Sequence, residues 1–234
     1  MRADIQLYCK EIENNIDKLI RIYEDSHNDL FFTEKELHSY FYHLCLESKI
    51  FIIENGFSLI HTEYPTPFKC KKDNLKLIDY AGIDENKIRG HIDFVVLNPN
   101  FVNWIIDNKK DIKYLTGLTN GSFSKYIIEF SDIYIDFQSA FNEPILLFAL
   151  EFKYIRHGFS GTKYPKNEIR YDIAKLDLLK NKKLMINGRK IHFCLKTLSL
   201  AFIGHRIISD FKEFSNEIKD KDCRIINKTN NYAT

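Results

Sequence analysis

An acidic and a basic residue sit inside one of the most hydrophobic stretches of the chain, residues 145–155 (ILLFALEFKYI). Glu151 and Lys153 are two positions apart, so on a β-strand their side chains point to the same face, about 7 Å apart along the backbone. Charged groups in a buried strand are costly unless a partner or ligand compensates their desolvation. The pair is either functional or a salt bridge at a sheet edge, and the apolar flanking residues favour a functional pair.

Asp93 has the same unusual setting, in the middle of the β-branched and apolar stretch 91–97 (HIDFVVL). Such a carboxylate either caps a loop, pairs with a lysine or arginine, or binds a metal cation. Two carboxylates from adjacent strands form a hard oxygen site suited to Mg²⁺ or Mn²⁺. A lysine beside them can orient a water or stabilise charge on a phosphate. Together with Glu151 and Lys153, Asp93 supplies the groups that phosphodiester hydrolysis requires.

Asp93 on one strand, followed by Glu151-x-Lys153 on the next, resembles the PD-(D/E)xK nuclease superfamily, which has the restriction-endonuclease-like fold. The resemblance covers residues 33–205. It implies that Asp93 and Glu151 bind the metal, that the backbone carbonyl of Phe152 adds a ligand, and that Lys153 assists the attacking water. Asp93 follows an isoleucine instead of proline, a substitution that the family tolerates.

The resemblance also implies a catalytic glutamate on the first core helix, and Glu36 occupies that place. Glu36 follows Thr33 by three residues, so it also completes a capping box and has a local role without any metal. Glu47, on nearly the same helix face, and Glu63, near the end of a predicted strand, are alternatives. Members of the family often have a polar residue on the helix after the second motif, and residues 172–176 (DIAKL) match that place.

Several cations follow the Glu151-x-Lys153 strand, beginning in the glycine-bearing loop at 156–167. Such a loop can clamp the phosphates of a nucleic acid, and its alternative is a solvated loop. The predicted contacts to nucleic acid are Lys163, Lys166, Arg170, Lys175 and His91. For His91, which shares a strand face with Asp93, we favour a hydrogen-bonded structural role over a phosphate contact.

The composition is that of an ordinary globular protein. The 234 residues are 44% hydrophobic and 28% charged, with a net charge of +2, so a nucleic-acid surface must be a local basic patch. The five cysteines form no CxxC pair, which argues against a zinc knuckle or disulfide framework and predicts buried thiols. No stretch approaches the roughly 20 apolar residues of a membrane helix, so we predict a soluble, cytoplasmic protein without membrane contact.

Hydrophobic spacing and turn residues predict the elements that position these side chains. Helices are expected at 3–25, 33–49, 101–114, 168–181 and 207–218, and strands at 57–63, 91–97, 124–130, 132–137, 145–155 and 191–203. The segment 64–67 (YPTP) is expected to end the first strand.

The predicted fold class is α/β, with a restriction-endonuclease-like mixed β-sheet core flanked by helices. We expect a single nuclease domain at 1–234, with an N-terminal helical segment at 1–28 and a frayed tail at 227–234. The gap of 58 residues between Asp93 and Glu151 predicts an insertion at 98–144, between the two catalytic strands.

These observations predict a metal-dependent nuclease with Mg²⁺ as cofactor, Mn²⁺ as an alternative, and DNA as the expected substrate. Its predicted catalytic residues are Asp93, Glu151, Lys153 and Glu36. The alternative is a non-cleaving nucleic-acid-binding or assembly subunit that retains the fold. The intact set of acid, acid and lysine argues against that alternative. The choice between DNA and RNA, and between a monomer and a homodimer, stays open.

Overall fold

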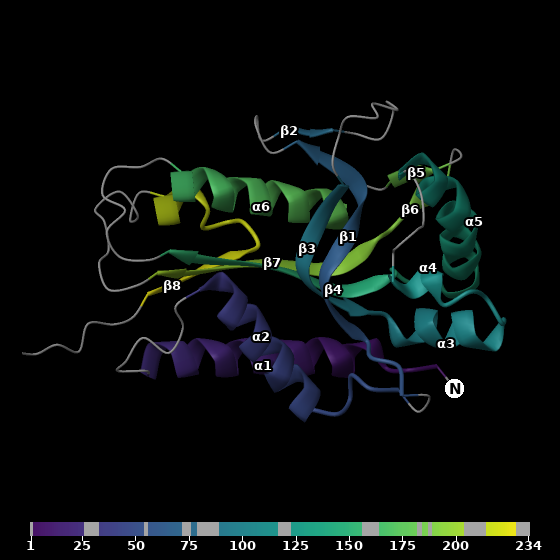
Figure 1. Cartoon of the computed structure of the whole chain (residues 1–234), viewed down its shortest axis with the longest axis horizontal. Helices are drawn as coiled ribbons and strands as arrows, with labels where there is room; N and C mark the ends of the chain where they lie inside the picture. Colours follow the sequence, from purple (N-terminus) through teal and green to yellow (C-terminus); the bar gives the residue numbers. More distant parts are fainter. Residues whose placement is uncertain are drawn as a thin grey trace, which may run out of the picture.

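A mixed β-sheet lies between two layers of helices, which makes this an α/β protein (Figure 1). The computed structural model describes residues 2–25, 33–53, 56–71, 76–78, 89–116, 123–155, 164–181, 184–186, 189–203 and 214–227, and the structural statements below concern these residues. Helix α6 (Tyr164–Asn181) covers one face of the sheet. Helices α1 (Ile5–Asp25) and α2 (Glu34–Glu47) cover the other.

Five strands form the body of the sheet, in the spatial order β1-β3-β4-β7-β8. They are β1 (Ile60–Lys71), β3 (Arg89–Leu97), β4 (Leu146–Ile155), β7 (Cys194–Ile203) and β8 (Cys223–Asn227). The three-residue strand β2 (Lys76–Ile78) extends the edge beside β1, and β5 (Leu184–Ile186) pairs separately with β6 (Arg189–Ile191). The pairs β1–β3 and β3–β4 are antiparallel, whereas β4–β7 and β7–β8 are parallel. Helix α6 lies in the crossover that the parallel β4–β7 pair requires.

The sequence of α2 fixes both its start and its buried face. Thr33 caps the helix: its side chain accepts the Glu36 N–H, and the Glu36 carboxylate accepts the Thr33 N–H at 2.7 Å. Phe41 lies on the buried face, with ring centroids 4.8 Å from Phe94 of β3 and 5.4 Å from Phe152 of β4. These contacts seat α2 across the two strands that carry the predicted catalytic residues.

The predicted helices at 3–25 and 33–49 and the predicted strands at 91–97 and 145–155 are confirmed to within two residues at each end. The helix expected at 168–181 is also confirmed and begins earlier, at 164. The region 101–114 divides into α3 (Pro99–Asp107) and α4 (Lys113–Thr116), and 191–203 divides into β6 and β7. Of the last predicted helix, only residues 214–217 are described as helical, and 204–213 lie outside the described residues. Strand β8 was not predicted.

The strands predicted at 124–130 and 132–137 are wrong, because one helix, α5 (Phe123–Phe141), spans both. β-branched and aromatic residues favour strands. However, Phe130, Ile133, Tyr134 and Phe137 recur at helical spacing, and all four are buried. Burial of this stripe outweighs the local strand preference.

The prediction that residues 64–67 end the first strand is also wrong, because β1 continues to Lys71. Pro65 lies opposite His91 in the β1–β3 register. On the other side of β1, the described chain pairs β2 only with residues 69–71. Pro65 therefore lies on an edge portion of the sheet, where a residue without an N–H is tolerated.

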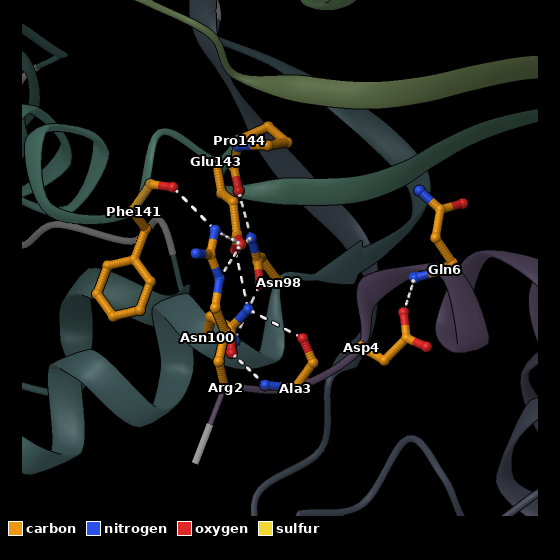
Figure 2. Close-up of polar contacts among 9 residues, drawn as sticks. All are labelled: Arg2, Ala3, Asp4, Gln6, Asn98, Asn100, Phe141, Glu143 and Pro144. Carbon is orange, nitrogen blue, oxygen red and sulfur yellow. Dashed lines mark hydrogen bonds and ion pairs between the residues drawn. The ribbon is translucent and has the colours of Figure 1, made fainter.

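The segment 98–144, predicted as an insertion, holds α3, α4 and α5 at one end of the sheet (Figure 1). A polar cluster joins its two ends to the start of the chain (Figure 2). The buried carboxylate of Glu143 accepts hydrogen bonds from Asn98 at 3.0 Å, Asn100 at 2.9 Å and Arg2 at 2.8 Å. The backbone N–H of Ala3 donates to Asn100 at 2.7 Å. The segment therefore leaves and re-enters the sheet at neighbouring points.

Candidate functional site

Asp93 and Glu151 lie at the point where β3 and β4 begin to separate. Phe94 pairs with Leu150 in the antiparallel register, and Asp93 and Glu151 are the next residues on the two strands. The Asp93 carboxylate accepts the backbone N–H of Phe152 at 2.7 Å. The side chain of Asp93 thus fills the place that a strand carbonyl would take, and it joins the two predicted motifs directly.

Lys153 connects the helices on the two faces of the sheet. Its ammonium lies 3.4 Å from the Glu34 carboxylate of α2. It also lies 3.6 Å from Glu168 and 3.7 Å from Asp172, both on α6. The Lys153 side chain is 18% exposed. Its ammonium therefore lies near three carboxylates and is still partly accessible to solvent.

Helix α2 contributes a histidine and a glutamate beside Asp93. His38 Nε2 lies 3.5 Å from Asp93 Oδ2. One ligand atom from each of Glu34, His38 and Asp93 falls within 4.8 Å of the other two. The His38 ring packs 5.0 Å from the ring of Phe152, and its Nε2 is buried without a hydrogen bond among the described residues. These three residues have the donor types and spacing of a metal-binding group.

Lys175 of α6 lies on the other side of the centre, against Glu151. Its ammonium is 2.6 Å from Glu151 Oε1 and 3.8 Å from Asp172 Oδ1, and it donates to the His91 carbonyl at 2.9 Å. Glu151, Asp172 and Lys175 are all buried. Asp172 therefore lies between two lysine ammonium groups, with one carboxylate oxygen toward each of them.

The surroundings of Asp93 keep its carboxylate ionised. Burial alone would raise the pKa of Asp93. The neighbouring imidazole of His38, the Phe152 N–H and the charge of Lys175 together outweigh burial, so the pKa of Asp93 falls below its usual value. Asp93 is therefore an anion at neutral pH and available to bind a cation.

Burial dominates at the other two carboxylates. It raises the pKa of Glu151 well above its usual value, with smaller contributions from the charges of Asp93 and Asp172, and the Lys175 ammonium opposes the rise. Burial also raises the pKa of Asp172, to about 6, against the opposing charges of Lys175 and Lys153. Both carboxylates therefore depend on nearby lysines for their ionisation.

The two lysines are held in their cationic form. Burial would lower the pKa of Lys153, but the carboxylates of Asp172 and Glu34 outweigh it and the pKa is raised. Burial acts in the same way on Lys175, where Glu151 and Asp172 outweigh it and raise the pKa. The centre thus combines fixed positive charge with carboxylates, which suits an anionic substrate bound through a metal ion.

The predicted helix glutamate, Glu36, lies at the start of α2 with its carboxylate on the N–H and hydroxyl of Thr33. It is exposed, as are its alternatives Glu47 and Glu63. The group near Asp93 with the spacing to hold a metal ion instead includes two other residues of the same helix, Glu34 and His38.

The predicted nucleic-acid contacts have different surroundings. Arg170 is exposed, forms hydrogen bonds of 2.9 and 2.6 Å with Glu217, and stacks over Phe214. Lys166 is half-buried on α6, and His91 is exposed on β3. Lys175 is only 6% exposed, so its ammonium faces Glu151 rather than the surface. Lys163 and the rest of 156–163 lie outside the described residues.

Sequence reasoning missed three members of the centre: Glu34, His38 and Glu168. The signal for the first two was a Glu-x-x-x-His spacing, which places both side chains on one helix face. A search for pairs of histidines does not find it, because the partner of His38 is a glutamate. Glu168 precedes Asp172 by four residues on α6, so the same spacing rule applies to it.

No family model, curated protein or solved structure matches this chain. The function is therefore inferred from the residues of the centre. In the part of the chain that the structure describes, none of the helices combines the length and apolar character needed to cross a membrane.

Proposed function

We propose that this protein is a metal-dependent nuclease of the PD-(D/E)xK kind, with the restriction-endonuclease-like fold and with DNA as its substrate. One observation carries the proposal. Asp93 of β3 and the Glu151-x-Lys153 motif of β4 lie on adjacent strands and are joined by the 2.7 Å hydrogen bond from Phe152 N–H to Asp93. Two carboxylates and a lysine at one place are the groups that phosphodiester hydrolysis uses.

The residues present fit a divalent cation. The ionised carboxylate of Asp93 and the buried Nε2 of His38, which has no hydrogen bond in the described chain, face one another, with Glu34 beside them. Glu151 adds a further carboxylate one residue before Phe152. A bound divalent cation supplies a Lewis acid that polarises a phosphate and makes water more acidic.

The chain's own residues supply the remaining chemistry. Lys153 brings a partly exposed ammonium to the centre, where it can neutralise charge that develops on a phosphate or orient a water. Glu34, Glu168 and Asp172 fix its position from two helices. Lys175 of α6 neutralises Glu151 from the face of the sheet opposite α2 and acts through that contact as a positioning residue.

The test is cleavage of plasmid DNA and single-stranded DNA in Mg²⁺ or Mn²⁺, comparing the wild type with Lys153→Ala. Lys196→Ala is the matched control, because Lys196 is also an ion-paired lysine on a strand but contacts Glu13 instead of the centre. We expect metal-dependent cleavage that falls on the order of a hundredfold or more in Lys153→Ala and persists in Lys196→Ala.

Equal cleavage by the wild type and Lys153→Ala would contradict the assigned centre. No cleavage of either substrate in either metal, by a wild type whose circular dichroism shows a folded protein, would reject the proposal for DNA. Binding of nucleic acid without cleavage would then support a non-cleaving subunit.

A further inference from the structure

We propose that Glu34, His38 and Asp93 form the cation site of this centre, and that its imidazole ligand makes the site select a divalent transition-metal ion over Mg²⁺. The inference deepens the proposed nuclease, since it concerns the same centre. It differs from the ligand set that the sequence motif implies, which is Asp93, Glu151 and the Phe152 carbonyl. Metal binding tests it without any cleavage.

The spacing of the donors fits one ion. An octahedral ion with bonds of about 2.1 Å has neighbouring ligands about 3 Å apart and opposite ligands about 4.2 Å apart. His38 Nε2 and Asp93 Oδ2 are 3.5 Å apart, and all three donors lie within 4.8 Å of one another. Small side-chain movements bring them to coordination distance. Glu34 and His38 are one helical turn apart on α2, so a single rigid helix presents both.

The buried imidazole of His38 faces Asp93 at 3.5 Å without a well-formed hydrogen bond. Its residue is 8% exposed and its Nε2 is buried without a hydrogen bond. A buried polar atom without a well-formed hydrogen bond is unfavourable. The ring is held against Phe152 at 5.0 Å and faces Asp93. A cation between His38 and Asp93 satisfies the nitrogen and the carboxylate together.

The distribution of charge places the cation on the α2 side. Glu151 already has the Lys175 ammonium at 2.6 Å. Among the described residues, no lysine or arginine makes an ion pair with Asp93, whose nearest basic side chain is His38 at 3.5 Å. Of the two carboxylates, Asp93 is therefore the one without an ion-paired lysine or arginine among the described residues. Glu34, which contacts Lys153 at 3.4 Å, joins this cation site to the lysine.

The donor set determines the metal preference. Mg²⁺ binds oxygen ligands and gives up its waters reluctantly. Imidazole nitrogen is a softer ligand that favours transition-metal ions. A site with one imidazole and two carboxylates therefore favours a divalent transition-metal ion, for which Mn²⁺ is a suitable probe because it also accepts carboxylate ligands.

The experiment measures Mn²⁺ and Mg²⁺ binding to the full chain by titration calorimetry, with electron paramagnetic resonance of Mn²⁺ as a second readout. The variant is His38→Ala, and the control is His43→Ala, which removes an exposed histidine of the same helix that lies near Glu47. We expect the wild type to bind Mn²⁺ about tenfold or more tightly than Mg²⁺. His38→Ala should lose that preference, and His43→Ala should keep it.

Equal affinity of the wild type for the two ions, or unchanged Mn²⁺ affinity in His38→Ala, would overturn the inference. If His38→Ala does not fold, His38→Phe fills the buried space without a metal ligand and takes its place. The two proposals fail separately. Cleavage of DNA without Mn²⁺ selectivity rejects this inference alone, whereas selective Mn²⁺ binding without cleavage rejects only the nuclease.

Discussion

Lys175 and Glu151 form a buried ion pair, with Nζ 2.6 Å from Oε1, on the side of the centre away from α2. The lysine belongs to α6 and the glutamate to β4, so the contact joins the helix to the middle of the sheet. Burial raises the pKa of Glu151, and the Lys175 charge opposes that rise. The Lys175 ammonium therefore stabilises the ionised form of the buried Glu151 carboxylate.

Replacing Lys175 with methionine removes the counter-charge and leaves Glu151 buried beside apolar atoms. Breaking a buried pair from one side costs about 3–5 kcal/mol. We expect Lys175→Met to lower the free energy of unfolding by that order, measured by urea denaturation. The double variant Lys175→Met with Glu151→Leu should recover most of the loss, because no buried charge then lacks a partner.

Lys18→Met is the matched control for this prediction. Its ammonium lies 3.4 Å from Glu47, and both side chains are about half exposed, so its loss should cost less than about 1 kcal/mol. Similar losses for Lys18→Met and Lys175→Met would contradict a special role for the buried pair.

The sequence predicted the elements whose pattern was local. The stripe of α2, the capping box and the apolar strands β3 and β4 all depend on spacing within one segment, and all three are present. Helix α5 was misjudged because its residue types favour a strand while its burial follows a helix. The continuation of β1 through Pro65 depends on which strand lies beside it, and the sequence does not contain that information.

The same distinction applies to the centre. Asp93 and Glu151 could be found because a charge in an apolar strand is unusual by itself. His38 and Glu34 are ordinary helix residues until β3 is placed against α2, and only then does Asp93 lie 3.5 Å from the imidazole. Lys175 was predicted to contact nucleic acid, whereas the fold buries it against Glu151.

The Glu143 cluster should make stability depend on pH. Burial would raise the pKa of Glu143, but hydrogen bonds from Asn98, Asn100 and Arg2 outweigh it, so its folded pKa lies below the usual 4.5. This stabilisation is present above about pH 4.5 and is lost as the pH falls through the folded pKa. We expect Glu143→Gln to reduce stability by about 1.5–3 kcal/mol at pH 7 and by less at pH 3.

Urea denaturation of the wild type and Glu143→Gln at both pH values measures this change. Glu47→Gln, at an exposed position of α2, should stay within about 0.5 kcal/mol of the wild type at each pH. A Glu143→Gln deficit of the same size at pH 3 as at pH 7 would show that the charge of Glu143 contributes nothing.

Two glutamates of α2 should separate capping from metal binding. Glu36→Gln retains a capping box, since glutamine also accepts the Thr33 N–H, and it should leave Mn²⁺ affinity and cleavage within about twofold of the wild type. Glu34→Gln removes a charged donor from the proposed cation site and should weaken Mn²⁺ binding at least about tenfold. Calorimetry of the two variants gives the comparison. The opposite order of effects would restore Glu36 as the functional glutamate.

Metal binding at Asp93 should stabilise the folded protein. A ligand that binds only the folded state adds about 2.7 kcal/mol at a hundred times its dissociation constant, so Mn²⁺ should raise the unfolding temperature and excess chelator should reverse the rise. Asp93→Asn removes the ionised carboxylate between His38 and the Phe152 N–H and should abolish the increase. Asp132→Asn, at an exposed position of α5, should keep it. An equal increase in Asp93→Asn would mean that Mn²⁺ binds elsewhere on the molecule, because this variant removes the carboxylate around which the proposed site is built.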